Sequence, residues 1–127
     1  MNPVDGESRP ARQEDPCRTR EVLDIVGDKW ALLVVRTLSQ GPRRFTELKR
    51  AIDGISQRML TVTLRDLERD GILTRTVRNV MPPHVSYELT PMGTTLREAT
   101  APLLEWSVLH LPRIDAARAA YDARPDA

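Results

Sequence analysis

Arginine side chains recur along one face of the helix predicted for residues 56–70. At roughly 100° per residue, this face collects Arg58, Val62, Arg65 and Arg69, with Thr61 beside them. The opposite face is apolar and consists of Leu60, Leu64 and Leu67. A guanidinium group can donate two hydrogen bonds to guanine or hold a phosphate. The pattern favours a helix that packs through its leucines and offers cations to a nucleic acid, although an amphipathic helix with solvated arginines looks the same.

The residues around this helix predict where it begins and ends. Ser56 is a natural N-cap, and Gly71 can close the other end in a left-handed conformation. A shorter helix, capped by Thr46, should precede it, with a tight turn at Asp53-Gly54 between the two. Helix, glycine turn and helix is the helix-turn-helix arrangement, whose second helix enters the major groove of DNA.

The pattern changes period after residue 71. Residues 72–80 and 84–89 both alternate, on either side of a turn at 81–83 that holds two prolines. We therefore expect a β-hairpin, which directly after a recognition helix would be a wing. Three side chains near its tip could reach the DNA backbone or the minor groove, namely Arg78, Asn79 and His84. A purely structural hairpin is the alternative.

Two helices are predicted before this region. The first has Asp15 as N-cap and Pro16 as first helical residue, and it runs to about residue 26. Asp28 caps the second, which runs to about residue 39. Its apolar stripe consists of Trp30, Leu33, Val34 and Leu38. Residues 43–45 are too few to judge by pattern and could form a single extended pairing before the next helix.

The last helix begins with Thr90 as cap and Pro91 as first residue. Pro102 should bend this helix and Pro112 should close it. Apolar residues recur along it at spacings of three and four, namely Met92, Leu96, Ala99, Leu103, Trp106 and Leu109 or His110. Because this seam continues past what a small core needs, it predicts a surface for a partner helix. Alternatively, the region around Trp106 folds back onto its own domain.

The 127 residues suffice for one domain, which we place at residues 15–112. Residues 1–14 are polar and predict a disordered arm, and residues 113–127 form a charged, alanine-rich tail, either a short extra helix or a frayed end. The net charge is only +1, but residues 43–78 hold nine Lys and Arg against five Asp and Glu. Such a locally basic surface fits phosphate contact.

Several kinds of protein are disfavoured by composition. One cysteine and two distant histidines, His84 and His110, argue against a disulfide framework or a metal site. No glycine-rich phosphate loop and no cysteine–histidine pair placed for nucleophilic attack is present, so we expect neither an enzyme nor a bound cofactor. No apolar run could span a membrane and no signal peptide is recognisable, so a cytoplasmic protein without membrane contact is expected.

Several strings resemble the HxlR-type regulators, a bacterial family of winged helix-turn-helix proteins related to the MarR group. The strings are LDIVGDKW at 23–30, GPRRFTEL at 41–48, GISQRMLT at 54–61, LRDLERDG at 64–71 and PPHVSYELTPMG at 82–93. A cysteine that opens the first helix also matches, and the similarity covers roughly residues 17–108. The strings GISQxMLT and GDKW are the specific ones.

The resemblance implies a mainly α fold with a small β-hairpin, a winged helix-turn-helix that dimerises through its first and last helices. It implies a homodimeric transcriptional regulator on an inverted-repeat operator, and leaves open whether it is a repressor. Residues expected to face DNA are Ser56, Gln57, Arg58, Thr61 and Arg65, with phosphate contacts from the wing and around Arg43 and Arg44. The dimer interface would hold Leu23, Leu96, Ala99, Leu103 and Trp106.

Cys17 is a candidate redox sensor, because some members of this family sense electrophiles or oxidants through a thiol at the matching position. The first turn of a helix and the charges of Arg18 and Arg20 favour a thiolate, while Glu14 and Asp15 oppose it. Modification near the dimer interface could change the spacing of the recognition helices or join the subunits by a disulfide. The alternative is a small buried apolar residue.

Two other functions remain open from the sequence. A winged helix can serve as a protein–protein adaptor, but an adaptor has little need for the uncompensated pair Arg58 and Arg65. A small-molecule effector could also bind between the dimer helices and control the regulator. The sequence names no such ligand.

Overall fold

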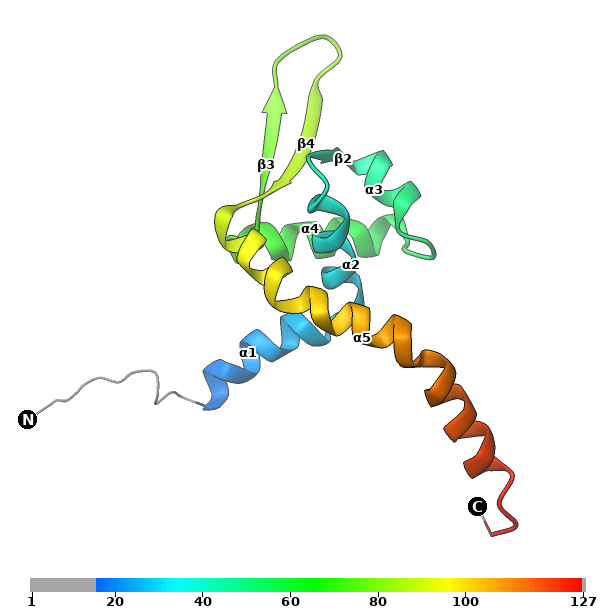
Figure 1. The fold of residues 1–127 in the computed structure, drawn as a ribbon. Helices are drawn as coiled ribbons and strands as arrows, with labels where there is room; N and C mark the ends of the chain where they lie inside the picture. Colours follow the sequence, from blue (N-terminus) through cyan, green and yellow to red (C-terminus); the bar gives the residue numbers. More distant parts are fainter. Residues whose placement is uncertain (1–15, 127) are drawn as a thin grey trace, which may run out of the picture.

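The computed structural model describes residues 16–126, with side chains from residue 18 onward. The predicted arm at 1–14 and the predicted cap Asp15 lie outside the described residues. The elements in chain order are α1 (Pro16–Gly27), α2 (Lys29–Leu38), β2 (Arg43–Arg44), α3 (Phe45–Ala51), α4 (Gln57–Arg69), β3 (Leu73–Arg78), β4 (His84–Leu89) and α5 (Pro91–Asp122). In Figure 1 the β3–β4 hairpin projects from one side of the helical body, and α5 leaves it on the other. This arrangement confirms the predicted fold class.

The core lies where α2, α4 and the base of the sheet meet. Its fully buried side chains are Val34, Val35, Leu48, Leu60 and Leu73. The predicted apolar face of α4 is buried as expected, and complete burial of one leucine contributes roughly 1.5–3 kcal/mol. Burying this face fixes α4 about its own axis, so the opposite face must point outward.

The sheet has three antiparallel strands in the order β2-β4-β3. The hairpin is in register from Leu73 opposite Leu89 to Arg78 opposite His84. The extended pairing considered for residues 43–45 is confirmed, because β2 pairs with β4 and places Arg43 opposite Tyr87. The two-residue strand β2 thus fastens the segment before α3 to the wing.

The predicted caps at Asp28, Ser56 and Thr90 are confirmed. The carboxylate of Asp28 accepts hydrogen bonds from the backbone N–H groups of residues 30 and 31, at 2.9 and 3.1 Å. The hydroxyls of Ser56 and Thr90 each accept one from the N–H group three residues on, both at 3.0 Å. Gly54 and Gly71 have φ angles of 85° and 78°, which favour glycine at the turn before α4 and at its end.

Thr46 does not cap α3, contrary to the sequence prediction. The helix begins at Phe45 with Arg44 as its N-cap residue, two residues before the predicted cap. The carboxylate of Glu47 accepts a hydrogen bond from the backbone N–H of Arg44 at 2.8 Å. An acid at the third helical position therefore satisfies a donor at this end, so no hydroxyl is needed there.

Pro112 does not close α5, so this prediction is also wrong. The helix continues to Asp122 and contains both Pro102 and Pro112. Each proline removes one helical hydrogen bond, but both are exposed, so water can reach the carbonyl that loses its donor. The alanine-rich stretch after Pro112 has strong helix propensity and extends the helix. Figure 1 shows the axis of α5 changing direction along its length, as expected for a helix with internal proline.

Candidate nucleic-acid interface

The cationic face of α4 is open to solvent. Arg58 and Arg65 are both exposed, and neither guanidinium group makes a hydrogen bond or ion pair with any residue that the structure describes. Gln57 is exposed in the first turn, beside the capping residue Ser56. Thr61 is half-buried, and its hydroxyl donates to the carbonyl of Gln57 at 2.9 Å. The predicted groove-facing residues therefore share one face of α4, from its cap to beyond its middle.

The turn between α3 and α4 is held by two buried side chains. Ile52 and Ile55 flank the turn and belong to the core cluster. Ile55 precedes the cap of α4 and Leu60 is buried one turn into the helix, the arrangement of a hydrophobic staple. The N-terminal end of α4 is thereby fixed relative to the body, which a helix needs if its side chains are to read base edges.

Arg44 and His84, both predicted near phosphate, meet in the structure although they are 40 residues apart. The Nη2 atom of Arg44 lies 2.7 Å from Nδ1 and 3.2 Å from Nε2 of the His84 ring. Because guanidinium only donates, the imidazole nitrogen is the acceptor. This contact joins the start of α3 to the wing and depends on the β2–β4 pairing.

Arg43 is arranged differently from its neighbour. Its Nη1 atom donates to the carbonyl of Pro42 at 2.9 Å, and its Nη2 atom lies 3.5 Å from Oε1 of Gln40. The side chain is half-buried and turned back on the loop before it. Part of its donor capacity is therefore used inside the chain.

At the wing tip, Arg78 and Asn79 are exposed, and their side chains have no hydrogen-bond partner in the described part of the chain. Arg78 stands opposite His84 at the last pair of the hairpin. Three nitrogen-rich side chains, those of Arg44, Arg78 and His84, thus come from this end of the sheet, where a phosphate backbone could pass.

The sequence interpretation missed Arg75. This side chain is exposed on β3 and lines a hollow of about 370 Å³ between α4 and the sheet, together with Thr61 and Arg65. In the strand alternation Arg75 falls with Leu73 along β3, but Leu73 is buried and Arg75 is not. The hairpin extends beyond the body, so only its base is covered and Arg75 is exposed. In the sequence, only the number of Lys and Arg residues around residue 65 could have indicated that Arg75 belongs to the candidate site.

The predicted dimer residues lie on α1 and α5. Leu23, Ala99, Leu103 and Trp106 are exposed, whereas Leu96 is half-buried and packs against the core. The ring of Trp106 stacks on His110 with centroids 4.5 Å apart. Further exposed apolar side chains on α5 are Val108, Leu109 and Leu111. Apolar side chains are thus exposed on both elements, as expected for an interaction surface.

Cys17 lies in the first turn of α1, and its side chain is outside the described part. The neighbouring Arg18 forms an ion pair with Glu21, with Nε and Oε2 3.1 Å apart. Among the described residues, no group of three or more His, Cys, Asp or Glu is placed to hold a metal ion. No described helix is both long and apolar enough to cross a membrane.

A short helix, a glycine turn, a capped helix with free arginines and a following wing define a winged helix-turn-helix protein. Residues 25–115 match the HxlR-like helix-turn-helix family, and the chain belongs to that family. The family suggested by the sequence strings is therefore confirmed.

The chain is similar to named transcriptional regulators over most of its length. It is 43% identical over 104 residues to the uncharacterized HTH-type transcriptional regulator YtfH of Escherichia coli, covering 82% of each chain. The solved structure of the putative transcriptional regulator ytfH from Salmonella typhimurium superposes with a TM-score of 0.73 at 42% identity, covering 79% of this chain and 89% of that one. The protein is accordingly a transcriptional regulator of the helix-turn-helix type.

A second similar structure is the redox regulator HypR in its reduced form. It has a TM-score of 0.72 and 36% identity, covering 78% of this chain and 98% of the HypR chain. A structure of HypR in its oxidized form is also similar, with a TM-score of 0.67.

Proposed function

We propose that the protein acts in the cytoplasm as a homodimer that recognises an inverted-repeat DNA operator through α4. The observation that carries this proposal is the division of α4 into a buried leucine face and an exposed face, on which Arg58 and Arg65 have no partner among the described residues. Unpaired arginines at the accessible end of a capped helix can reach guanine edges in the major groove. Ser56, Gln57 and Thr61 supply shorter polar groups on the same end.

The remaining cations would hold the DNA backbone. Arg44, fixed by His84, and Arg78 at the wing tip lie where a duplex seated on α4 would present phosphates. Arg43 contributes with the donors not used inside the chain, and Asn79 adds a neutral donor. Contacts of this kind set orientation and make binding depend on salt concentration.

The dimer would form through α1 and α5, where Leu23, Ala99, Leu103 and Trp106 are exposed and Leu96 continues the seam toward the core. A twofold pair of α4 helices reads half-sites about 34 Å apart, one turn of DNA. The symmetry of the dimer then requires the inverted repeat.

The central test replaces Arg65 with alanine. We expect Arg65→Ala to weaken binding to an operator selected from a random DNA pool by about 1–3 kcal/mol, with relaxed preference at one base position. Fluorescence anisotropy on matched duplexes measures both quantities. Arg113→Ala, which removes an exposed arginine far along α5, is the control and should leave binding unchanged. Unchanged affinity of Arg65→Ala for both operator and random DNA would show that α4 does not face DNA.

Salt dependence separates a DNA regulator from a protein adaptor. Operator affinity should fall steeply with salt, and Arg78→Ala should reduce the slope of log K against log salt by about 1. An adaptor built on the same fold would show no specific DNA binding at any salt concentration.

Control by thiol oxidation is a second proposed function, favoured by the similarity to HypR in its reduced and oxidized forms. Oxidation of Cys17 at the start of α1 would alter the dimer and thereby the spacing of the two α4 helices. Diamide should change operator affinity of the parent protein but not of Cys17→Ser. Full modification of Cys17 with unchanged affinity would end this proposal and leave DNA recognition intact.

A further inference from the structure

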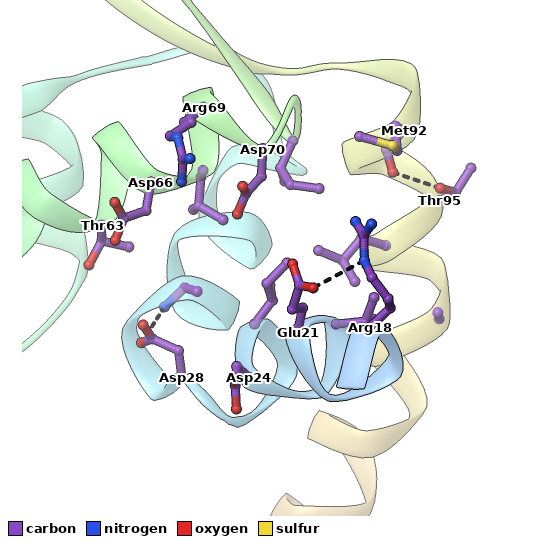
Figure 2. Close-up of a pocket in the computed structure, with 17 residues that line it drawn as sticks. Arg18, Glu21, Asp24, Asp28, Thr63, Asp66, Arg69, Asp70, Met92 and Thr95 are labelled. Atoms are coloured by element: carbon purple, nitrogen blue, oxygen red, sulfur yellow. Dashed lines mark hydrogen bonds and ion pairs between the residues drawn. The ribbon is translucent and has the colours of Figure 1, made fainter. Parts of the chain in front are cut away.

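A groove of about 860 Å³ lies behind α4, between it and the helices α1 and α5 (Figure 2). It is lined by α1, the start of α2, the C-terminal half of α4 and the start of α5. Ile25, Leu67, Met92 and Leu96 contribute apolar lining. The volume falls in the range of about 300–1,000 Å³ that small-molecule sites occupy.

The charged lining of this groove is predominantly acidic. Five carboxylates outnumber the two arginines, Arg18 and Arg69. The carboxylate of Glu21 is paired with Arg18, and that of Asp28 accepts the two capping hydrogen bonds of α2. The other three, on Asp24, Asp66 and Asp70, make no ion pair with a described residue. Asp66 and Asp70 stand one helical turn apart, where like charges destabilise a helix unless a cation compensates them.

Thr63 provides an independent sign of a ligand. This residue lines the groove and is only 4% exposed, yet its hydroxyl has no hydrogen-bond partner in the described part of the chain. In the same structure, Thr37, Thr61 and Thr100 each donate to the carbonyl four residues back, at 2.8, 2.9 and 2.9 Å. Figure 2 shows Thr63 on the side of α4 that faces the start of α2. The residue is buried, but its oxygen is not closed off from the solvent, so the hydroxyl can reach a molecule bound in the groove.

We propose that this groove binds a small organic cation with an apolar or aromatic body. The apolar lining receives the body, Asp66 and Asp70 balance the positive charge, and the hydroxyl of Thr63 accepts a hydrogen bond from an ammonium group. All of the lining residues come from one protomer, and two of them, Leu96 and Ala99, also belong to the proposed dimer seam. Because α4 forms one wall and α1 and α5 form others, occupancy would link the recognition helix to the helices of the dimer. This last step alone rests on the proposed function.

The experiment uses two probes of nearly equal size and shape but opposite charge, tetraphenylphosphonium and tetraphenylborate. Isothermal titration calorimetry on the full chain without DNA should give one tetraphenylphosphonium per protomer, with tetraphenylborate bound at least about tenfold more weakly. Asp66→Asn/Asp70→Asn should weaken tetraphenylphosphonium about tenfold. Asp115→Asn/Asp122→Asn, on the exposed end of α5, is the matched control and should change nothing.

Three results would overturn the proposal: no tetraphenylphosphonium binding, equal binding of both probes, or unchanged binding by Asp66→Asn/Asp70→Asn. A tetraphenylphosphonium affinity that falls as protein concentration rises would show that a second copy of the chain fills the groove, which also excludes the proposal. The titration contains no DNA, so it can succeed where operator binding fails, and the reverse also holds.

Thr63 is tested with a cation that can donate a hydrogen bond. Thr63→Val should weaken 3,3-diphenylpropylammonium about fivefold and leave tetraphenylphosphonium, which has no N–H, unchanged. If Thr63→Val weakened the binding of both probes equally, the Thr63 hydroxyl would not contact the ligand.

Discussion

Leucine side chains are buried in one part of this molecule and exposed in another. In α4, Leu60 and Leu67 are 0% and 2% exposed, whereas Leu23 on α1 and Leu109 on α5 are 60% and 73% exposed. The winged helix-turn-helix completes its core within one chain, and the α1–α5 region does not. Apolar periodicity therefore identifies the apolar face of a helix, but not whether the same chain covers it.

The largest effect should come from Gly93 at the junction of the two parts. Gly93 is buried, and an added Cβ atom would overlap the carbonyl oxygen of Ile72. We expect Gly93→Ala to lower the free energy of unfolding by about 3 kcal/mol or more, because backbone must move. Gly27→Ala is the control, since a Cβ there meets nothing within 4 Å. Urea denaturation measures the free energy of unfolding of both variants. An equal loss in Gly27→Ala and Gly93→Ala would show that Gly93 is not tightly packed against Ile72.

Trp106 tests whether the exposed part needs a partner. We expect Trp106→Ala to weaken dimerisation by about 2 kcal/mol, as for a central aromatic at an interface. The stability of the winged helix-turn-helix should change far less, because Trp106 lies outside its core cluster. Sedimentation velocity over a dilution series gives the dimer constant. A dimer constant that is unchanged would place the interface elsewhere.

Replacing serine with alanine should lower the free energy of unfolding at the start of α4 and raise it inside α5. Ser56→Ala removes the acceptor for the N–H of Met59 and should cost about 1 kcal/mol of unfolding free energy. Ser107 lies inside α5 and is only half-buried, so water can replace the bond from its hydroxyl to the carbonyl of Leu104. Because such a back-bond slightly destabilises a helix and alanine is the better helix former, Ser107→Ala should gain about 0.5 kcal/mol. Thermal and urea unfolding of the pair measure the difference. A loss of similar size at both positions would argue against the assigned cap.

The smallest effect expected is at Thr63. Thr63→Val removes a hydroxyl without a partner in the described chain and should raise the free energy of unfolding by about 0.5 kcal/mol. Thr100→Val, which loses a hydrogen bond to Leu96, should instead lower it by about 1 kcal/mol. If Thr63→Val destabilises the protein as much as Thr100→Val, the Thr63 hydroxyl has a partner within the protein.

Much of the fold follows from neighbours in sequence. The caps at Asp28, Ser56 and Thr90 depend on side chains that bond within three residues, so they could be read directly. The start of α3 was misplaced because Glu47 satisfies the backbone of Arg44 from inside the helix. The end of α5 was misplaced because proline's cost depends on exposure, which the sequence does not state.

In the candidate site, too, some features follow from neighbours in sequence and others do not. The outward position of Arg58 and Arg65 follows from the leucine period of one helix. The contact between Arg44 and His84 requires a strand pair across 40 residues, and the exposure of Arg75 depends on how far the wing leaves the body. The groove behind α4 combines four elements, so no local pattern could have revealed it.

The length of α5 has a mechanical consequence. With 32 residues and a rise of about 1.5 Å each, it is about 48 Å long. A tilt of about 5° at its root would move Leu96 by less than about 1 Å but carry the far end through about 4 Å. The helix acts as a lever, so a change too small to disturb packing near the groove would become a large displacement at Tyr121.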